Sequence, residues 1–119
     1  MSAKTILVID DDPSVCLMIK LFFERQGYVV ETAEDGIDGL GHLAHGYPDL
    51  IFLDVQMPML NGHKVLELLR ARQVKIPVLV MSANPDVPSW VAEIGAAGFV
   101  PKPFSFPDLL PLVEQILGA

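Results

Sequence analysis

Acidic residues follow two apolar segments of the chain. Asp10 and Asp11 come directly after the apolar residues 6–9, and Asp54 comes directly after residues 50–53. Three carboxylates brought together repel one another unless a cation neutralises them. Mg2+ suits this role, because it prefers carboxylate and phosphate oxygens together with water. A carboxylate beside bound Mg2+ can attack a phosphoryl group, so these residues predict phosphoryl transfer to an aspartate.

Two later residues extend the same constellation. Ser82 ends a strand-like segment and could donate a hydrogen bond to a phosphate oxygen, while Lys102 could place a compact positive charge on it. Each residue alone says little, since serine and lysine are common on surfaces and Asp54 could simply end a strand. Together they put an acid pair, a nucleophile, a hydroxyl and an ammonium at four strand ends, which indicates a phosphoryl-transfer site.

The elements that must position these residues alternate along the chain. Strand-like segments lie at residues 5–10, 28–33, 50–55, 78–82 and 99–101. Helical patterns lie at residues 15–23, 37–44, 65–69, 89–95 and 109–117. This order predicts an α/β fold of the (βα)5 type, a doubly wound, flavodoxin-like parallel sheet of five strands in the order 2-1-3-4-5. The first and third strands are then neighbours, and their carboxylates converge.

The helix boundaries carry signals of different strength. Asp12 is expected to cap the first helix, with Pro13 at its first position. Ser105 and Asp108 resemble a capping box before the last helix. The second helix is weakly coded, because glycines at positions 36, 39 and 41 lower its propensity.

Composition restricts the setting and the partners. A chain of 119 residues fits one domain, residues 1–119, and its net charge of −7 disfavours direct binding of nucleic acid. No apolar stretch reaches the roughly 20 residues of a membrane helix, and no signal peptide is expected. The single cysteine, Cys16, cannot form an internal disulfide, which suits a cytoplasmic protein. We expect Cys16 to be an inert helix residue.

Four motifs resemble those of response-regulator receiver domains, and together they span the chain. They are ILVIDDDP at residues 6–13, DLIFLDVQMPMLNG at 49–62, MSA at 81–83 and GFVPKPF at 98–104. The resemblance implies that Asp54 is the phosphoacceptor. It also implies that Asp11, Asp54 and the backbone carbonyl of Gln56 bind Mg2+, with Asp10 acting through a water molecule.

The resemblance assigns further roles near the predicted site. Ser82 and Lys102 would hold the phosphoryl oxygens, and Ser82 and Phe99 would move when the protein switches. The Lys102–Pro103 bond is expected to be cis, which only an X-Pro bond adopts at low cost.

The implied function is a phosphorylation-dependent switch in a two-component phosphorelay. The expected partners are a sensor histidine kinase or phosphotransfer protein and an unknown output protein, with no direct nucleic acid and no membrane. Such a protein is not an enzyme, since it catalyses only its own phosphorylation and dephosphorylation. The chain is expected to be a stand-alone receiver without an output domain.

Two enzyme or cofactor-binding classes with related features fit this sequence poorly. A haloacid-dehalogenase-type enzyme needs a second acid where Gln56 stands, and a flavin-binding domain needs a phosphate-cradling loop where the aspartates stand. A receiver-like interaction module that is not regulated by phosphorylation remains open.

One region departs from the family pattern. Pro85 and Pro88 predict an irregular loop before a short fourth helix that contains Trp90, and Phe99 lacks the hydroxyl of a tyrosine. Pro111 predicts that the last helix starts late or bends. We therefore expect an atypical partner surface.

Overall fold

The computed structural model describes residues 3–55, 62–83 and 96–118. Five parallel strands form one sheet in the order β2-β1-β3-β4-β5, as the sequence predicts. The strands are β1 (Thr5–Ile9), β2 (Val29–Ala33), β3 (Leu50–Asp54), β4 (Val78–Ser82) and β5 (Gly98–Pro101). The helices are α1 (Pro13–Arg25), α2 (Gly36–Ala44), α3 (Gly62–Ala71) and α5 (Phe106–Leu117). The predicted fourth helix, with Pro85, Pro88 and Trp90, lies outside the described residues.

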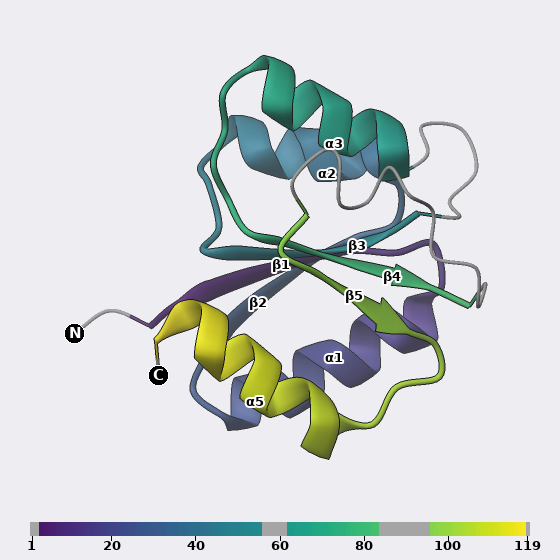
Figure 1. Cartoon of the computed structure of the whole chain (residues 1–119), viewed down its shortest axis with the longest axis vertical. Helices are drawn as coiled ribbons and strands as arrows, with labels where there is room; N and C mark the ends of the chain where they lie inside the picture. The colour runs from purple at the N-terminus through teal and green to yellow at the C-terminus, as the bar shows by residue number, and fades with distance from the viewer. Residues whose placement is uncertain (1–2, 56–61, 84–95, 119) are drawn as a thin grey trace.

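Helices cover both faces of the sheet. α1 and α5 lie on one face, and α2 and α3 lie on the other (Figure 1). β1 shows how one strand serves both sides, because Ile6 and Val8 pack in the α1–α5 layer while Leu7 and Ile9 pack in the α2–α3 layer. Every residue of β3 and β4 is buried, as expected for central parallel strands.

The helix caps agree with the sequence in part. The Asp12 carboxylate accepts the Ser14 amide at 2.9 Å, and Pro13 is the first residue of α1, so that prediction is confirmed. Ser105 is the N-cap of α5, but its hydroxyl donates to Asp108 at 2.8 Å and caps no backbone amide. The predicted capping box is therefore wrong in its hydrogen bonds, although it marked the correct boundary.

Pro111 does not delay the last helix. α5 begins at Phe106 and runs through Pro111 to Leu117, so the late start is wrong, while the predicted alternative, a bend at Pro111, stays a prediction. A proline removes one helical hydrogen bond. Leu109 and Val113 flank it and are both buried in the α1–α5 layer, and this packing holds the helix across the missing bond.

One outer edge of the sheet is covered by a side chain. The Val29 amide donates to Lys4 and the Ala33 carbonyl accepts the Asp10 amide, so the polar groups of these alternate residues of β2 point toward β1. The carbonyl of Val30 therefore points outward, where it accepts the Lys20 ammonium at 3.1 Å. Lys20 also pairs with Glu24 at 3.1 Å.

Across the described parts of the chain, no helix combines the length and the apolar character that crossing a membrane would require.

Candidate functional site

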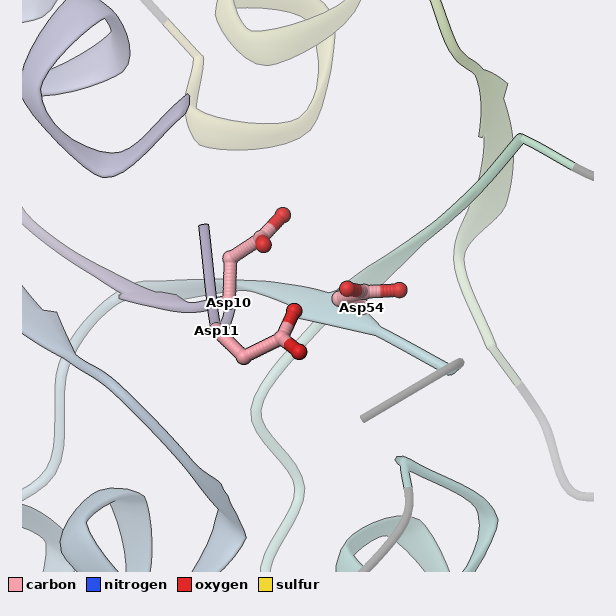
Figure 2. Close-up of side chains that lie close together, drawn as sticks. All are labelled: Asp10, Asp11 and Asp54. Carbon is pink, nitrogen blue, oxygen red and sulfur yellow. The ribbon is translucent and has the colours of Figure 1, made fainter. Parts of the chain in front are cut away.

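Three carboxylates meet where β1 and β3 end. Asp10, Asp11 and Asp54 each place one carboxylate oxygen so that all three atoms lie within 4.8 Å of one another (Figure 2). Two oxygens on opposite sides of an octahedral Mg2+ are about 4.2 Å apart, twice a metal–oxygen distance of about 2.1 Å. The three oxygens therefore lie close enough together to surround one cation, either directly or through water.

The sheet explains this convergence. β1 and β3 are parallel neighbours, and Ile9 pairs with Leu53, so the next residue of each strand reaches the same edge. The Asp10 amide donates to the Ala33 carbonyl at 3.1 Å, which ties the end of β1 to the end of β2. The Asp10 Oδ1 atom accepts the Asp12 amide at 2.8 Å. The turn that begins α1 thus fixes the orientation of the first carboxylate.

Burial singles out the same region. Among the residues that the structure describes, the buried polar side chains are those of Asp10 (0% exposed), Asp54 (4%) and Ser82 (2%). The sequence predicts all three as site residues. Asp11, by contrast, is exposed. Burying carboxylates is costly unless they are paired with positive charge or hydrogen-bonded, so this arrangement needs a compensating cation.

Lys102 supplies positive charge at the site. Its ammonium lies 2.7 Å from Asp10 Oδ2 and 3.5 Å from Asp54 Oδ2, and its side chain is 18% exposed. Burial lowers the pKa of Lys102, but the hydrogen bond to Asp10 and the charges of Asp10 and Asp54 outweigh it, and the net pKa is raised. Lys102 therefore stays protonated at neutral pH. Its principal partner is Asp10, a contact that the sequence did not indicate.

The backbone brings Lys102 and Ser82 to this edge together. Ser82 is the last residue of β4, and its carbonyl accepts the Lys102 amide at 2.9 Å just after β5 ends. The Lys102–Pro103 peptide bond is cis, as the resemblance implies. The ends of four strands thus contribute to one region, in the order that the sequence predicts.

The charges at this site do not balance. Three carboxylates carry three formal negative charges and the Lys102 ammonium carries one positive charge, which leaves two negative charges. A divalent cation neutralises two charges, and the oxygen donors are those that Mg2+ prefers. Asp11 and Asp54 are suited to direct coordination. Both oxygens of Asp10 already accept hydrogen bonds, which suits contact through water.

Two further predicted residues, Gln56 and Phe99, are not among the buried polar residues that the structure describes at the site. Gln56, with its backbone carbonyl, is outside the described residues. Phe99 lies on β5, where it pairs with Val80, and its partly buried ring packs against the α2–α3 layer. It is not one of the residues around the three carboxylates.

Sequence reasoning missed one close neighbour of the site. The Cys16 thiol donates to the Asp10 carbonyl at 3.3 Å and is buried under the β1–α1 turn. Burial, followed by the charge of Asp10, raises the pKa of Cys16 to about 11. The thiol is therefore protonated at neutral pH, in agreement with the expected inert residue. The only signal for this contact in the sequence is that Cys16 lies one turn into α1, close to Asp10 along the chain.

Comparison with known sequences gives a consistent family match. The model described as response regulator receiver domain matches residues 6–114. Response regulator MprA of Mycobacterium sp. (strain KMS) is 39% identical over 114 residues, which cover 94% of this chain and 50% of that protein. MprA of Mycobacterium ulcerans (strain Agy99) is also 39% identical, with 49% of it covered. The chain spans about half the length of the curated relatives that it matches.

Solved structures share the whole fold. Chemotaxis protein CheY4 of Vibrio cholerae has a TM-score of 0.89 at 28% identity, covering 98% of this chain and 100% of that one. Response regulator TrrA of Thermotoga maritima, solved in complex with Mg2+-BeF, has a TM-score of 0.86 at 31% identity, covering 96% and 99%. A CheY-like receiver domain protein from Methanospirillum hungatei has a TM-score of 0.92 at 25% identity, covering 98% and 95%.

Proposed function

Since this chain belongs to the family of response regulator receiver domains, we propose that it switches a two-component pathway by accepting a phosphoryl group on Asp54 with Mg2+ bound beside it. The family supports phosphorylation-based signalling in general.

One observation carries the assignment of Asp54. It is buried at the end of a central strand, with carboxylates of Asp10 and Asp11 within 4.8 Å and the Lys102 ammonium at 3.5 Å. A carboxylate held among a cation, an ammonium and a hydroxyl is suited to attack phosphorus, because the negative charge that develops on the phosphoryl oxygens meets positive charge and a donor. Asp10 and Asp11 are less suited. Asp10 is engaged by Lys102, and Asp11 is open to water.

In this proposal a phosphohistidine donates the phosphoryl group to Asp54. An oxygen of Asp54 bonds to phosphorus, and the bond between phosphorus and the imidazole nitrogen breaks. The electron pair of that bond stays on the ring nitrogen, which takes a proton from solvent. The product is an acyl phosphate on Asp54, which water later hydrolyses to the carboxylate and inorganic phosphate. The chain thus promotes only its own phosphorylation and dephosphorylation.

Mg2+ supplies charge neutralisation at the phosphoryl oxygens when it is bound. Asp11 and Asp54 would hold it directly with the carbonyl of Gln56, and Asp10 would hold it through water. The proposal is supported by the three oxygen donors and by TrrA, a relative of the same fold that was solved with Mg2+-BeF.

The chain's own residues would receive the new phosphoryl group. Lys102 is placed to pair with its oxygens, and the Ser82 hydroxyl to donate to one of them. Movement of Ser82 and Phe99 would then alter the surface formed by β5 and α5. Phosphorylation in this scheme shifts a population between two arrangements, because the new contacts exist in only one of them.

The partners follow from the chemistry and from the relatives. A sensor histidine kinase or a phosphotransfer protein would supply the phosphoryl group in the cytoplasm. An output protein or an output domain would read the altered surface. The MprA relatives are about twice as long as the matched region, so both forms of output are compatible with the family.

The proposal is tested by incubating the protein with Mg2+ and acetyl phosphate and measuring its intact mass. We expect a gain of one phosphoryl group, lost in Asp54→Asn. Asp12→Asn is the matched control, because it removes a neighbouring charge and keeps a residue that caps helices well. Full labelling of Asp54→Asn would contradict the assignment. No labelling of the wild-type protein would favour the interaction module that is not regulated by phosphorylation.

A further inference from the structure

Two histidines and a glutamate line one hollow between α2 and β2. The hollow has a volume of about 430 Å3, and His42, His45 and Glu31 are among the residues around it. Thr5, the first residue of β1, also lines it. Since Asp10 follows the last residue of β1, the hollow lies toward the end of the sheet opposite to the three carboxylates.

The two elements turn these side chains toward the same space. Glu31 and Ala33 are two residues apart on β2, so their side chains lie on the same face of the sheet. Ala33 packs in the α2–α3 layer, which places Glu31 on the face that α2 covers. His42 is in the last turn of α2 and His45 is its C-cap, three residues further on, so the two share a side of the helix.

Local contacts hold one ring nitrogen of each histidine and leave the other for a ligand. The His45 Nδ1 atom lies 2.9 Å from the Gly41 carbonyl oxygen, which can only accept a hydrogen bond. In the neutral ring Nδ1 therefore carries the proton, and Nε2 keeps its lone pair. The His42 Nε2 atom lies 3.9 Å from Asp38 Oδ1, one turn earlier in α2. A carbonyl or carboxylate behind the imidazole is the usual arrangement for histidines that bind metal.

We propose that this hollow is a second cation site, which takes Zn2+ through His42, His45 and Glu31. Two imidazole nitrogens and one carboxylate, with water in the remaining position, form a known tetrahedral ligand set for Zn2+. Mg2+ prefers oxygen ligands throughout, so it would remain at the three carboxylates. The proposal goes beyond the proposed function, because it involves neither Asp54 nor phosphate.

The ligands must turn to meet the ion. Across residues 3–55, 62–83 and 96–118, three ligand atoms lie within 4.8 Å of one another at the three carboxylates alone. Glu31 and His45 are exposed and the His42 side chain is 32% exposed, so rotation of their side chains meets little packing. Ordering them lowers the affinity for Zn2+. In return, the bound ion joins the end of α2 to β2 and stabilises the folded protein.

The test is a calorimetric titration of the full chain with ZnCl2 in excess MgCl2, which competes for the three carboxylates. We expect one Zn2+ per chain, and a Kd that rises at least about tenfold in His42→Gln and in His45→Gln. His63→Gln is the matched control, because His63 is the third histidine of the chain and belongs to α3, and its Kd should be unchanged. A wild-type protein that binds no Zn2+, or binding that survives both substitutions, would overturn the proposal.

A separate variant tests the carboxylate. Glu31→Gln should raise the Kd for Zn2+ by about tenfold, because it replaces a charged ligand with a neutral amide. Glu114→Gln makes the same change in net charge at an exposed residue of α5, on the other face of the sheet, and should bind Zn2+ as the wild-type protein does (Figure 1). Equal affinities of the two variants would show that β2 contributes no ligand, and the site as proposed would be wrong.

A measurement on the wild-type protein needs no variant in order to be decisive. Zn2+ bound to a ring nitrogen shifts the imidazole signals of that histidine in the NMR spectrum. We expect the signals of His42 and His45 to move together as ZnCl2 is added in excess MgCl2, while those of His63 stay in place. Movement of the His63 signals alone, or of none, would contradict the proposal.

Discussion

Gly39 of α2 lies so close to Ile9 of β1 that a Cβ atom added to the glycine would stand 2.6 Å from the Ile9 Cδ1 atom. Ile9 is fully buried and directly precedes Asp10. The glycine therefore lets α2 approach the very end of the strand that carries the first site carboxylate. The same residue that weakens α2 as an isolated helix permits its packing.

Gly39→Ala is expected to destabilise the fold, because the added methyl group must push Ile9 or lift the helix. Overpacking of this kind costs about 1–3 kcal/mol, partly offset by a gain of up to about 1 kcal/mol in helix propensity. Gly41→Ala is the matched control, since nothing lies within 4 Å of a Cβ there, and it should be neutral or stabilising. Urea unfolding of the two variants checks the prediction, and equal stabilities would contradict it.

Asp11→Ala is expected to weaken Mg2+ binding most among single changes outside Asp54, by on the order of tenfold or more. The reason is that Asp11 is an exposed carboxylate of the three-oxygen site, so the substitution removes a candidate metal ligand without emptying a buried space. Its exposure also predicts little change in stability, within about 0.5 kcal/mol. Calorimetric titration with MgCl2 measures the effect, with Asp12→Asn as control. Unaltered affinity would remove Asp11 from the metal ligands.

Lys102→Ala is expected to slow phosphorylation without abolishing it, and to remove the conformational response. The nucleophile and the carboxylates remain, whereas the charge that pairs with the new phosphoryl group is lost. The rate is followed by intact mass, and the response by the emission of Trp90, the only tryptophan of the chain. Lys75→Ala should behave as the wild-type protein. A Lys102→Ala protein with a full emission change would show that the lysine does not couple phosphate to the switch.

Cys16 is expected to make the fold less stable as the solution becomes alkaline. The thiol ionises near pH 9.0 when unfolded and near 11 when folded, so between these values the folded protein retains a proton that the unfolded chain has released. The free energy of unfolding then falls as the pH rises. One thiol contributes a loss of about 3 kcal/mol between these two pKa values.

The measurement is urea unfolding at several pH values from about 8 to about 11. Lys102 and Tyr28 also have raised pKa values, so the informative quantity is the difference between the wild-type protein and Cys16→Ala. The variant should lose less stability across the window, whatever its stability at neutral pH. Parallel curves for the two proteins would mean that Cys16 does not titrate in this way.

The position of the acidic residues could be predicted because it depends on strand order. Apolar runs end at Asp10 and at Asp54, and a parallel sheet with neighbouring first and third strands brings both ends to one edge. Burial of Ser82 with them follows from the same rule. The family motifs then supplied roles that strand order alone does not give.

Other features could not be predicted, because they depend on contacts between distant parts of the chain. The Lys102 ammonium lies 2.7 Å from Asp10 and 3.5 Å from Asp54, although Lys102 and Asp10 are 92 residues apart in the sequence. So small a difference between the two distances depends on side-chain packing, which the sequence does not reveal. α5 persists through Pro111 because Leu109 and Val113 are buried on either side of it, which local propensity does not reveal. The close approach at Gly39 likewise depends on how α2 packs against β1. The sequence shows three glycines in α2 but does not indicate which of them this packing requires.

The contact between Lys20 and the outward carbonyl of Val30 bears on how this protein behaves when molecules crowd together. An open strand edge is a template on which a second chain can pair, and proteins commonly guard such edges with charge. A strand arriving at β2 would have to remove the ammonium, which also pairs with Glu24, from this acceptor before pairing there. A lysine that resembles ordinary surface charge in the sequence thus opposes intermolecular sheet growth along this side of the molecule.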